Sequence, residues 1–143
     1  MKTLQTLTAA LLLILSTSAF ANDETKANYK FEMNYALQTY IDAIAHGKVS
    51  GISEVLDNDV KFTTTRSEKI IHHSKAQTLK SLKENKNVEQ NCVTEYNLLE
   101  TNSSQAIVKV TMKYESFSKV NVVTLTNTTR GWKITNVSSS FLN

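Results

Sequence analysis

The sequence predicts an α+β domain in which N-terminal helices pack in a curved antiparallel sheet. Helical spacing of apolar residues dominates the first half of the chain. From Asn91 onward the chain is instead rich in valine, threonine and aromatic residues in strand-like runs. These runs follow one another without intervening helices, so the strand–helix alternation of a parallel α/β sheet is missing.

Residues 1–21 have the features of a signal peptide. Lys2 provides the positive start, residues 11–15 (LLLIL) form the apolar centre, and Ala19-Phe20-Ala21 is a small-residue cleavage site. The apolar run is too short for a membrane anchor, which needs about 20 residues. The sequence therefore predicts export to the periplasm or the medium. One mature domain is expected over residues 22–143, with no membrane span.

Charge and cysteine content exclude several classes of protein. The formal net charge is +3, and loss of Lys2 lowers it to +2, which is too mild to indicate a nucleic-acid partner. Cys92 is the one cysteine of the chain, so no internal disulfide can form. We expect it to be a small buried hydrophobe on a strand, with a reactive thiol as the alternative.

The helical elements come first. An apolar stripe within residues 29–46 predicts an amphipathic helix that ends at Gly47; it comprises Met33, Leu37, Tyr40, Ile41 and Ile44. Ser50 is a candidate N-cap for a short second helix whose apolar face is Ile52, Val55 and Leu56. The segment Ser74-Lys75-Ala76-Gln77 predicts a capping box for a third helix, with Ala76, Leu79 and Leu82 facing inward.

The strands are predicted from alternation and turn residues. Residues 60–66 and 69–72 are expected to pair through the turn at Ser67-Glu68. Four more strands are expected at 91–100, 105–117, 119–127 and 132–141. Their turns lie at Asn102-Ser103-Ser104, near Ser118, and at Thr129-Arg130-Gly131.

Two segments of the chain resemble a known superfamily. "YIDAIAHGKVSGISEVLDNDVKF" resembles the opening of the NTF2-like (SnoaL-like, cystatin-like cone) proteins, and "RGWKITNVSSSF" resembles their closing strand. The whole is most similar to the small exported proteins grouped as lumazine-binding or DUF4440-like domains. The resemblance implies a cone with a pocket at its open end, and homodimers formed sheet to sheet. Fold likeness alone does not establish a function.

The ketosteroid isomerase branch of that superfamily provides a test for catalysis. Its pattern places the tyrosine donor at Tyr40, the helix-ending glycine at Gly47 and the strand-entry aspartate at Asp59, and all three are present. The catalytic aspartate, however, falls at Thr64, which cannot take a proton at neutral pH. Residues 119–128 contain no Asp or Glu to serve as the second acid. The resemblance therefore does not carry the isomerase mechanism to this chain.

The candidate ligand pocket is assembled from strand alternation and the same resemblance. Alternation puts Phe62, Thr64 and Arg66 on one strand face, which the resemblance makes the pocket face. Strand packing without any ligand is the equally weighted alternative. The other candidates are Tyr40 from the first helix, His72 from the hairpin, and Met112 and Tyr114, for which packing in the core is the first expectation.

Metal and cofactor chemistry find no support in the motifs. His72 and His73 are adjacent and would point to opposite faces of a strand, and His46 is far away, so no metal site is expected. No cofactor is expected either, because a glycine-rich phosphate loop cannot be built from Gly47, Gly51 and Gly131.

Three hypotheses remain. The first is an exported, non-catalytic domain that binds a small, partly apolar molecule. The second is a protein-interaction module with a filled cone, acting through its sheet or through the lysine-bearing third helix. The third is a lyase or isomerase that uses a pocket histidine, and it requires that histidine within hydrogen-bond reach of Tyr40 or another polar group.

Overall fold

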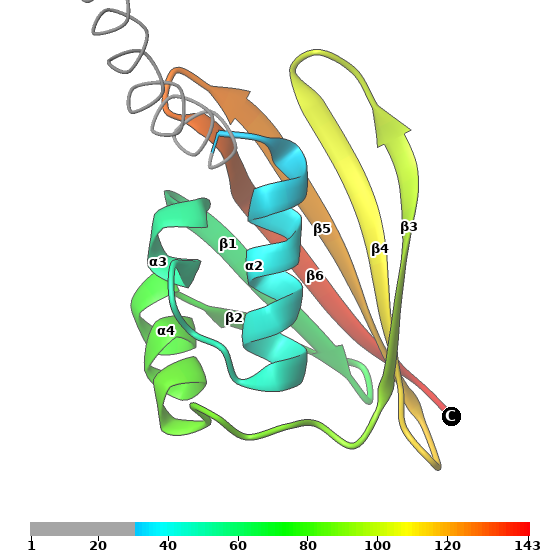
Figure 1. Cartoon of the computed structure of the whole chain (residues 1–143). Helices are drawn as coiled ribbons and strands as arrows, with labels where there is room; N and C mark the ends of the chain where they lie inside the picture. The colour runs from blue at the N-terminus through cyan, green and yellow to red at the C-terminus, as the bar shows by residue number, and fades with distance from the viewer. Residues whose placement is uncertain (1–30) are drawn as a thin grey trace, which may run out of the picture. The chain divides into compact units, whose positions relative to one another are not determined.

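A computed structural model describes residues 31–143. The predicted signal peptide lies outside these described residues. The elements follow in the order α2 (Met33–His46), α3 (Ile52–Val55), β1 (Leu56–Arg66), β2 (Lys69–His73), α4 (Lys75–Glu84), β3 (Val93–Thr101), β4 (Gln105–Lys113), β5 (Ser118–Thr128) and β6 (Gly131–Leu142). Figure 1 shows the three helices on one side of a curved sheet. The predicted α+β class is confirmed.

The sheet is mixed rather than purely antiparallel. Its strand order is β2-β1-β6-β5-β4-β3, and β6 returns beside β1 in parallel. The other neighbouring strands pair antiparallel, as the sequence predicts. The prediction of a purely antiparallel sheet is wrong for one pair of strands, β1 and β6, which are far apart in the chain. Such a long-range pairing leaves no local sequence signal, because neither strand carries a turn that specifies it.

The helix ends follow the predicted capping chemistry in two of three cases. Helix α2 ends at Gly47, which adopts the left-handed conformation (φ 63°), and α4 begins with the Ser74–Gln77 capping box. The N-cap of α3 is Gly51 (φ 79°) rather than Ser50. Leu56, expected on the face of that short helix, is the first residue of β1 instead.

The core lies between α2 and the inner face of the sheet. Buried residues of α2 include Ala36, Leu37 and Ile41, and they pack in one cluster with buried valines of β4, β5 and β6. Helix α4 completes the layer with Leu79 and Leu82, which are only partly buried. Ala76, expected to face inward, is exposed. We attribute this to the short length of α4, which covers only the end of the sheet near β1 (Figure 1).

Within residues 31–143, none of the helices has the length and apolar character needed to cross a membrane.

Candidate functional site

Three rows of side chains run across the strands on the inner face of the sheet. The first row is apolar, the second is largely polar, and the third contains a charged residue. Directly opposed residues on neighbouring strands point to the same face. The first row is apolar: Phe62, Val137, Val123 and Val108. The second row is largely polar: Thr64, Ser139, Asn121 and Val110. The third row contains Phe141, Lys119 and Met112. The floor of the cone is therefore apolar at depth and polar toward one end.

A cavity of about 240 Å³ lies above the first two rows. Helix α2 contributes Tyr40 and Ile44 to its wall, and α4 contributes Gln77, Thr78, Ser81 and Leu82. The strands contribute Phe62, Thr64, His73, Lys119, Val137 and Ser139. We call this space the inner cavity. Its volume is slightly below the range of about 300–1,000 Å³ typical of drug-sized ligands, so it suits a smaller molecule.

A second cavity of about 290 Å³ adjoins the inner cavity. The two share four lining residues, Ile44, Ser81, Leu82 and Lys119. The far wall includes Met112, Tyr114 and Gln90, and the Tyr114 hydroxyl donates to Gln90 Oε1 at 3.1 Å. Burial raises the pKa of Tyr114. The phenol is therefore a neutral donor in this wall at ordinary pH.

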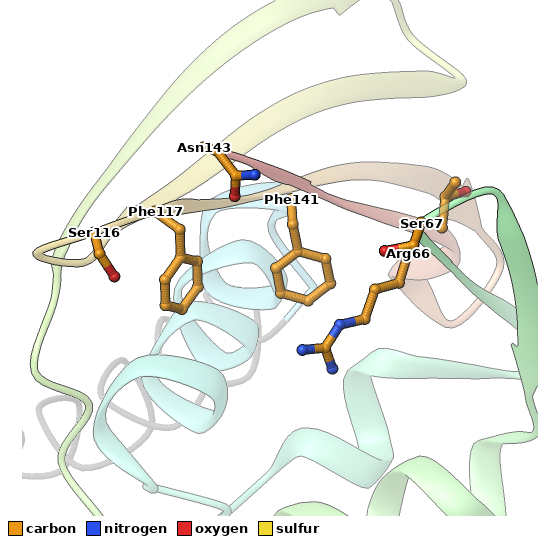
Figure 2. A pocket seen from close by; sticks show the side chains of 7 residues that line it. Arg66, Ser67, Ser116, Phe117, Phe141 and Asn143 are labelled. Atoms are coloured by element: carbon orange, nitrogen blue, oxygen red, sulfur yellow. The ribbon is translucent and has the colours of Figure 1, made fainter.

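A third space, of about 530 Å³, lies around Arg66, Phe117 and Phe141, near the last residues of β6 (Figure 2). We call it the outer hollow. Arg66 Cζ is 5.6 Å from the centroid of the Phe141 ring, which is a cation–π distance. The Phe117 ring is 6.2 Å from Phe141 and stacks on Tyr114 at 4.5 Å. Since Phe141 stands directly opposite Lys119, this hollow continues the inner face outward from the third row.

The structure divides the residues predicted for the pocket into three groups. Tyr40, Phe62 and Thr64 line the inner cavity together. Met112 and Tyr114 line the adjoining cavity, and Met112 is also fully buried. Arg66 lines the outer hollow and not the inner cavity.

The histidine that lines the inner cavity is His73 rather than the predicted His72. Phe62 pairs with His73 and faces inward, so His73 faces inward as well. His72 pairs with Thr63 on the opposite face, where its Nδ1 lies 3.2 Å from the Thr63 hydroxyl. The prediction that the two histidines point to opposite faces is confirmed. Which one points inward depends on the register of the hairpin, and the sequence does not specify that register.

Tyr40 presents a buried phenol to the inner cavity. Desolvation raises its pKa well above the ordinary value, so the hydroxyl remains a neutral donor. Among the described residues, none forms a hydrogen bond with this hydroxyl, although the side chain is 4% exposed. Thr64 and Ser139 add two hydroxyls to the same cavity. The Ser139 hydroxyl donates to Asn121 Oδ1 at 2.6 Å, which satisfies the amide oxygen of this fully buried asparagine.

Lys119 lines the site although the sequence did not predict it as a site residue. It sits in the third row, lines both adjoining cavities, and its pKa is lowered by burial of the amine. A signal did exist in the sequence. Lys119, Asn121, Val123 and Leu125 occupy alternate positions of β5 and point to the same face, so the inward face of this strand carries a positive charge.

Acidic side chains are missing from the lining of these three spaces. No Asp or Glu side chain lines the inner cavity, the adjoining cavity or the outer hollow. Over residues 31–143, no group of three or more His, Cys, Asp or Glu side chains could hold a metal ion. Cys92 is half-buried in the bend before β3 and not on a strand, with its Sγ 3.6 Å from the Thr94 hydroxyl.

Comparisons with known proteins agree with this geometry. The family described as "Putative lumazine-binding" matches residues 30–139. No curated protein matches the chain significantly. Among solved structures, NTF2-like proteins of unknown function from Shewanella baltica and Methylobacillus flagellatus both superpose with a TM-score of 0.60. Their identities are 9% and 13%, both cover 85% of this chain, and 95% and 94% of their own chains are covered.

An NTF2-like protein of unknown function from Silicibacter pomeroyi superposes with a TM-score of 0.58 at 11% identity. The match covers 82% of this chain and 96% of that one. Identities this low establish the fold alone, whereas the family match spans most of the chain and nearly all of its described part.

Proposed function

The chain belongs to the lumazine-binding family of NTF2-like domains, and we propose that it binds a small, partly apolar molecule in the inner cavity without converting it chemically. The observation that carries this proposal is the meeting of Tyr40, Phe62 and Thr64 around one cavity. Concave sites with an apolar floor and a few converging polar groups are typical of small-molecule binding.

The lining offers a ligand two kinds of contact. Phe62, Val137 and Leu82 supply apolar surface, and Tyr40 supplies a hydroxyl donor that no described residue uses. This hydroxyl lines the cavity, so a ligand acceptor can form a hydrogen bond with it in place of water. The family description makes lumazine, a flat bicyclic heterocycle, the first probe for such a site.

Filling the inner cavity should weaken binding. We expect Thr64→Phe to weaken the affinity for lumazine at least about tenfold in calorimetric titration, because the larger ring would occupy the space between Tyr40 and Phe62. Thr63→Phe is the matched control, since Thr63 lies on the opposite face of the same strand. Equal losses in both variants would contradict the proposal. So would native protein that shows neither heat with lumazine nor a copurified small molecule by mass spectrometry.

Two features support binding without catalysis. The position of the isomerase base is occupied by Thr64, which lines the cavity but has no basic group. His73 is the cavity residue suited to acid–base work, and its ring forms no hydrogen bond with any described residue. A general base is normally oriented by such a bond, so the enzyme hypothesis has no positioned group.

We further propose that residues 1–21 direct export and that the mature chain forms a homodimer through its sheet. The dimer is supported by the edge strand β3, whose exposed apolar side chains are Val93, Tyr96, Leu98 and Leu99. In Figure 1 this strand lies at the edge of the sheet away from the helices. Apolar side chains grouped on an unpaired edge are unusual for a monomer. A second copy of the chain is the partner that fits this strand.

Native mass spectrometry of protein expressed from the full-length chain tests both proposals. The expected mass corresponds to two chains that begin at Asn22. Leu99, which is 57% exposed, should be critical, and Leu99→Lys should yield a monomer that is still folded. Lys86→Met changes charge by the same amount in the opposite sense, and since Lys86 is exposed in the turn after α4, away from the edge strand, this variant should remain dimeric. A monomeric wild type at micromolar concentration would refute the dimer.

A further inference from the structure

Lys119 occupies a position between two cavities. It lines the inner cavity beside Thr64 and Ser139, and it lines the adjoining cavity beside Met112 and Tyr114. Its neighbours across the sheet are Phe141 on one side and Met112 on the other. Lys119 therefore lies where the inner face of the sheet changes from apolar to polar side chains, in the wall shared by the two cavities.

The charge of Lys119 has no counterion in the part of the chain that the structure describes. The ion pairs there are His46–Glu89, Lys80–Glu84 and Lys113–Glu95, all outside the three hollows. Lys119 forms no hydrogen bond with a described residue either. Lys119 is half-buried, and partial desolvation of an ammonium group without a partner lowers its pKa.

A second cation strengthens the local field. Arg66 lies in the outer hollow, over the Phe141 ring that stands opposite Lys119 (Figure 2). The inner and adjoining cavities are lined by Lys119 and by no acidic side chain, so their lining carries positive charge. A concave, partly desolvated surface of one sign attracts ligands of the opposite sign.

We propose that the ligand of the inner cavity is an aromatic or other flat apolar molecule that carries one carboxylate, which pairs with Lys119. This proposal rests on the proposed function and specifies the ligand class. The apolar body lies on Phe62 and Val137, and the Tyr40 hydroxyl donates a hydrogen bond to the ligand. A carboxylate paired with this half-buried amine forms a charge-assisted hydrogen bond, which is stronger than one between neutral groups.

The same residue should have opposite effects on stability and on binding. Lys119→Met keeps most of the side-chain volume and removes an unpaired, partly desolvated charge, so we expect a higher Tm for the free protein. If Lys119 had only a structural role, the variant would lose stability and binding together. A rise in Tm with a loss of carboxylate binding is the signature of a ligand-binding lysine.

A pair of matched probes tests the proposal. Naphthalene-2-carboxylate and naphthalene-2-carboxamide have nearly the same shape and differ in charge. We expect the wild type to bind the carboxylate at least about tenfold more tightly than the carboxamide in calorimetric titrations. Lys119→Met should bind both probes equally. Lys109→Met is the control, because Lys109 lies on the opposite face of β4 from Val108 and Val110 and carries the same charge.

The outcomes separate the two proposals. Equal binding of both probes by the wild type would overturn the carboxylate class and leave the proposed function standing. A wild type that binds neither probe and also fails to bind lumazine would overturn both. Equal loss of carboxylate preference in the Lys119 and Lys109 variants would show that general positive charge, and not Lys119, selects the anion.

Discussion

Replacement of Gly47 by alanine is expected to lower the free energy of unfolding by about 3–4 kcal/mol, the largest single-residue effect on stability that we predict. Gly47 ends α2 with φ 63°, which a residue with a Cβ adopts only at a cost. An added Cβ would also lie 2.6 Å from the backbone nitrogen of Val88 and 2.8 Å from the carbonyl oxygen of Asn85. Both contacts are with backbone, so a side-chain rotation cannot relieve them.

The matched control for Gly47→Ala is Gly51→Ala. Gly51 also has a left-handed conformation, with φ 79°, but an added Cβ would meet only the Tyr35 hydroxyl at 3.2 Å and the Thr39 methyl at 3.6 Å. Its cost should be about 1–2 kcal/mol, from the backbone conformation alone. Urea denaturation of the three proteins measures both values. Equal decreases in the free energy of unfolding would show that the segment around Val88 can shift to accommodate the added Cβ, so that the close approach does not contribute to the cost.

The contact between Gly47 and residues 85–88 also matters for the site. The amide of Asn87 donates to the Gly47 carbonyl at 2.9 Å, and the amide of Gln90 donates to the Ala45 carbonyl at 2.8 Å. These bonds hold the segment after α4 against the end of α2. Because Asn85, Val88 and Gln90 line the adjoining cavity, the end of α2 helps to build a wall of the site.

The sequence predicts most of the fold because the deciding signals are local. Helical spacing, the glycine after α2, the capping box of α4 and the alternation of β4 to β6 each depend on residues a few positions apart. The parallel pairing of β1 with β6 is the exception. It joins Phe62 to Val137 across most of the domain, and only the assembled core specifies it.

The site is less predictable than the fold, for a related reason. Tyr40, Phe62 and Thr64 could be proposed because the resemblance supplied the face of the sheet that lines the pocket. The choice between His72 and His73 depends on hairpin register, and the importance of Lys119 depends on which charges end up beside it. A lysine on a strand is ordinary in sequence. It becomes notable only when burial and the missing counterion are known.

Thr64→Asp should have the largest effect on ligand binding, because it would return an acid to the position where the isomerase branch carries one. The new carboxylate would share the inner cavity with Lys119. It would supply the counterion that we assign to the ligand, and its negative charge would repel a carboxylate ligand. We expect the affinity for naphthalene-2-carboxylate to fall about thirtyfold, or roughly 2 kcal/mol.

Thr64→Asn is the matched control for Thr64→Asp, since asparagine has nearly the shape of aspartate without the charge. We expect it to keep the carboxylate affinity within about threefold and both variants to bind the carboxamide alike. Isomerase activity is not expected from the aspartate variant, because a carboxylate beside a lysine is held at low pKa and is a weak base. If the asparagine variant lost carboxylate binding as fully as the aspartate variant, the loss would reflect shape. The charge of Lys119 would then have no role in choosing the ligand.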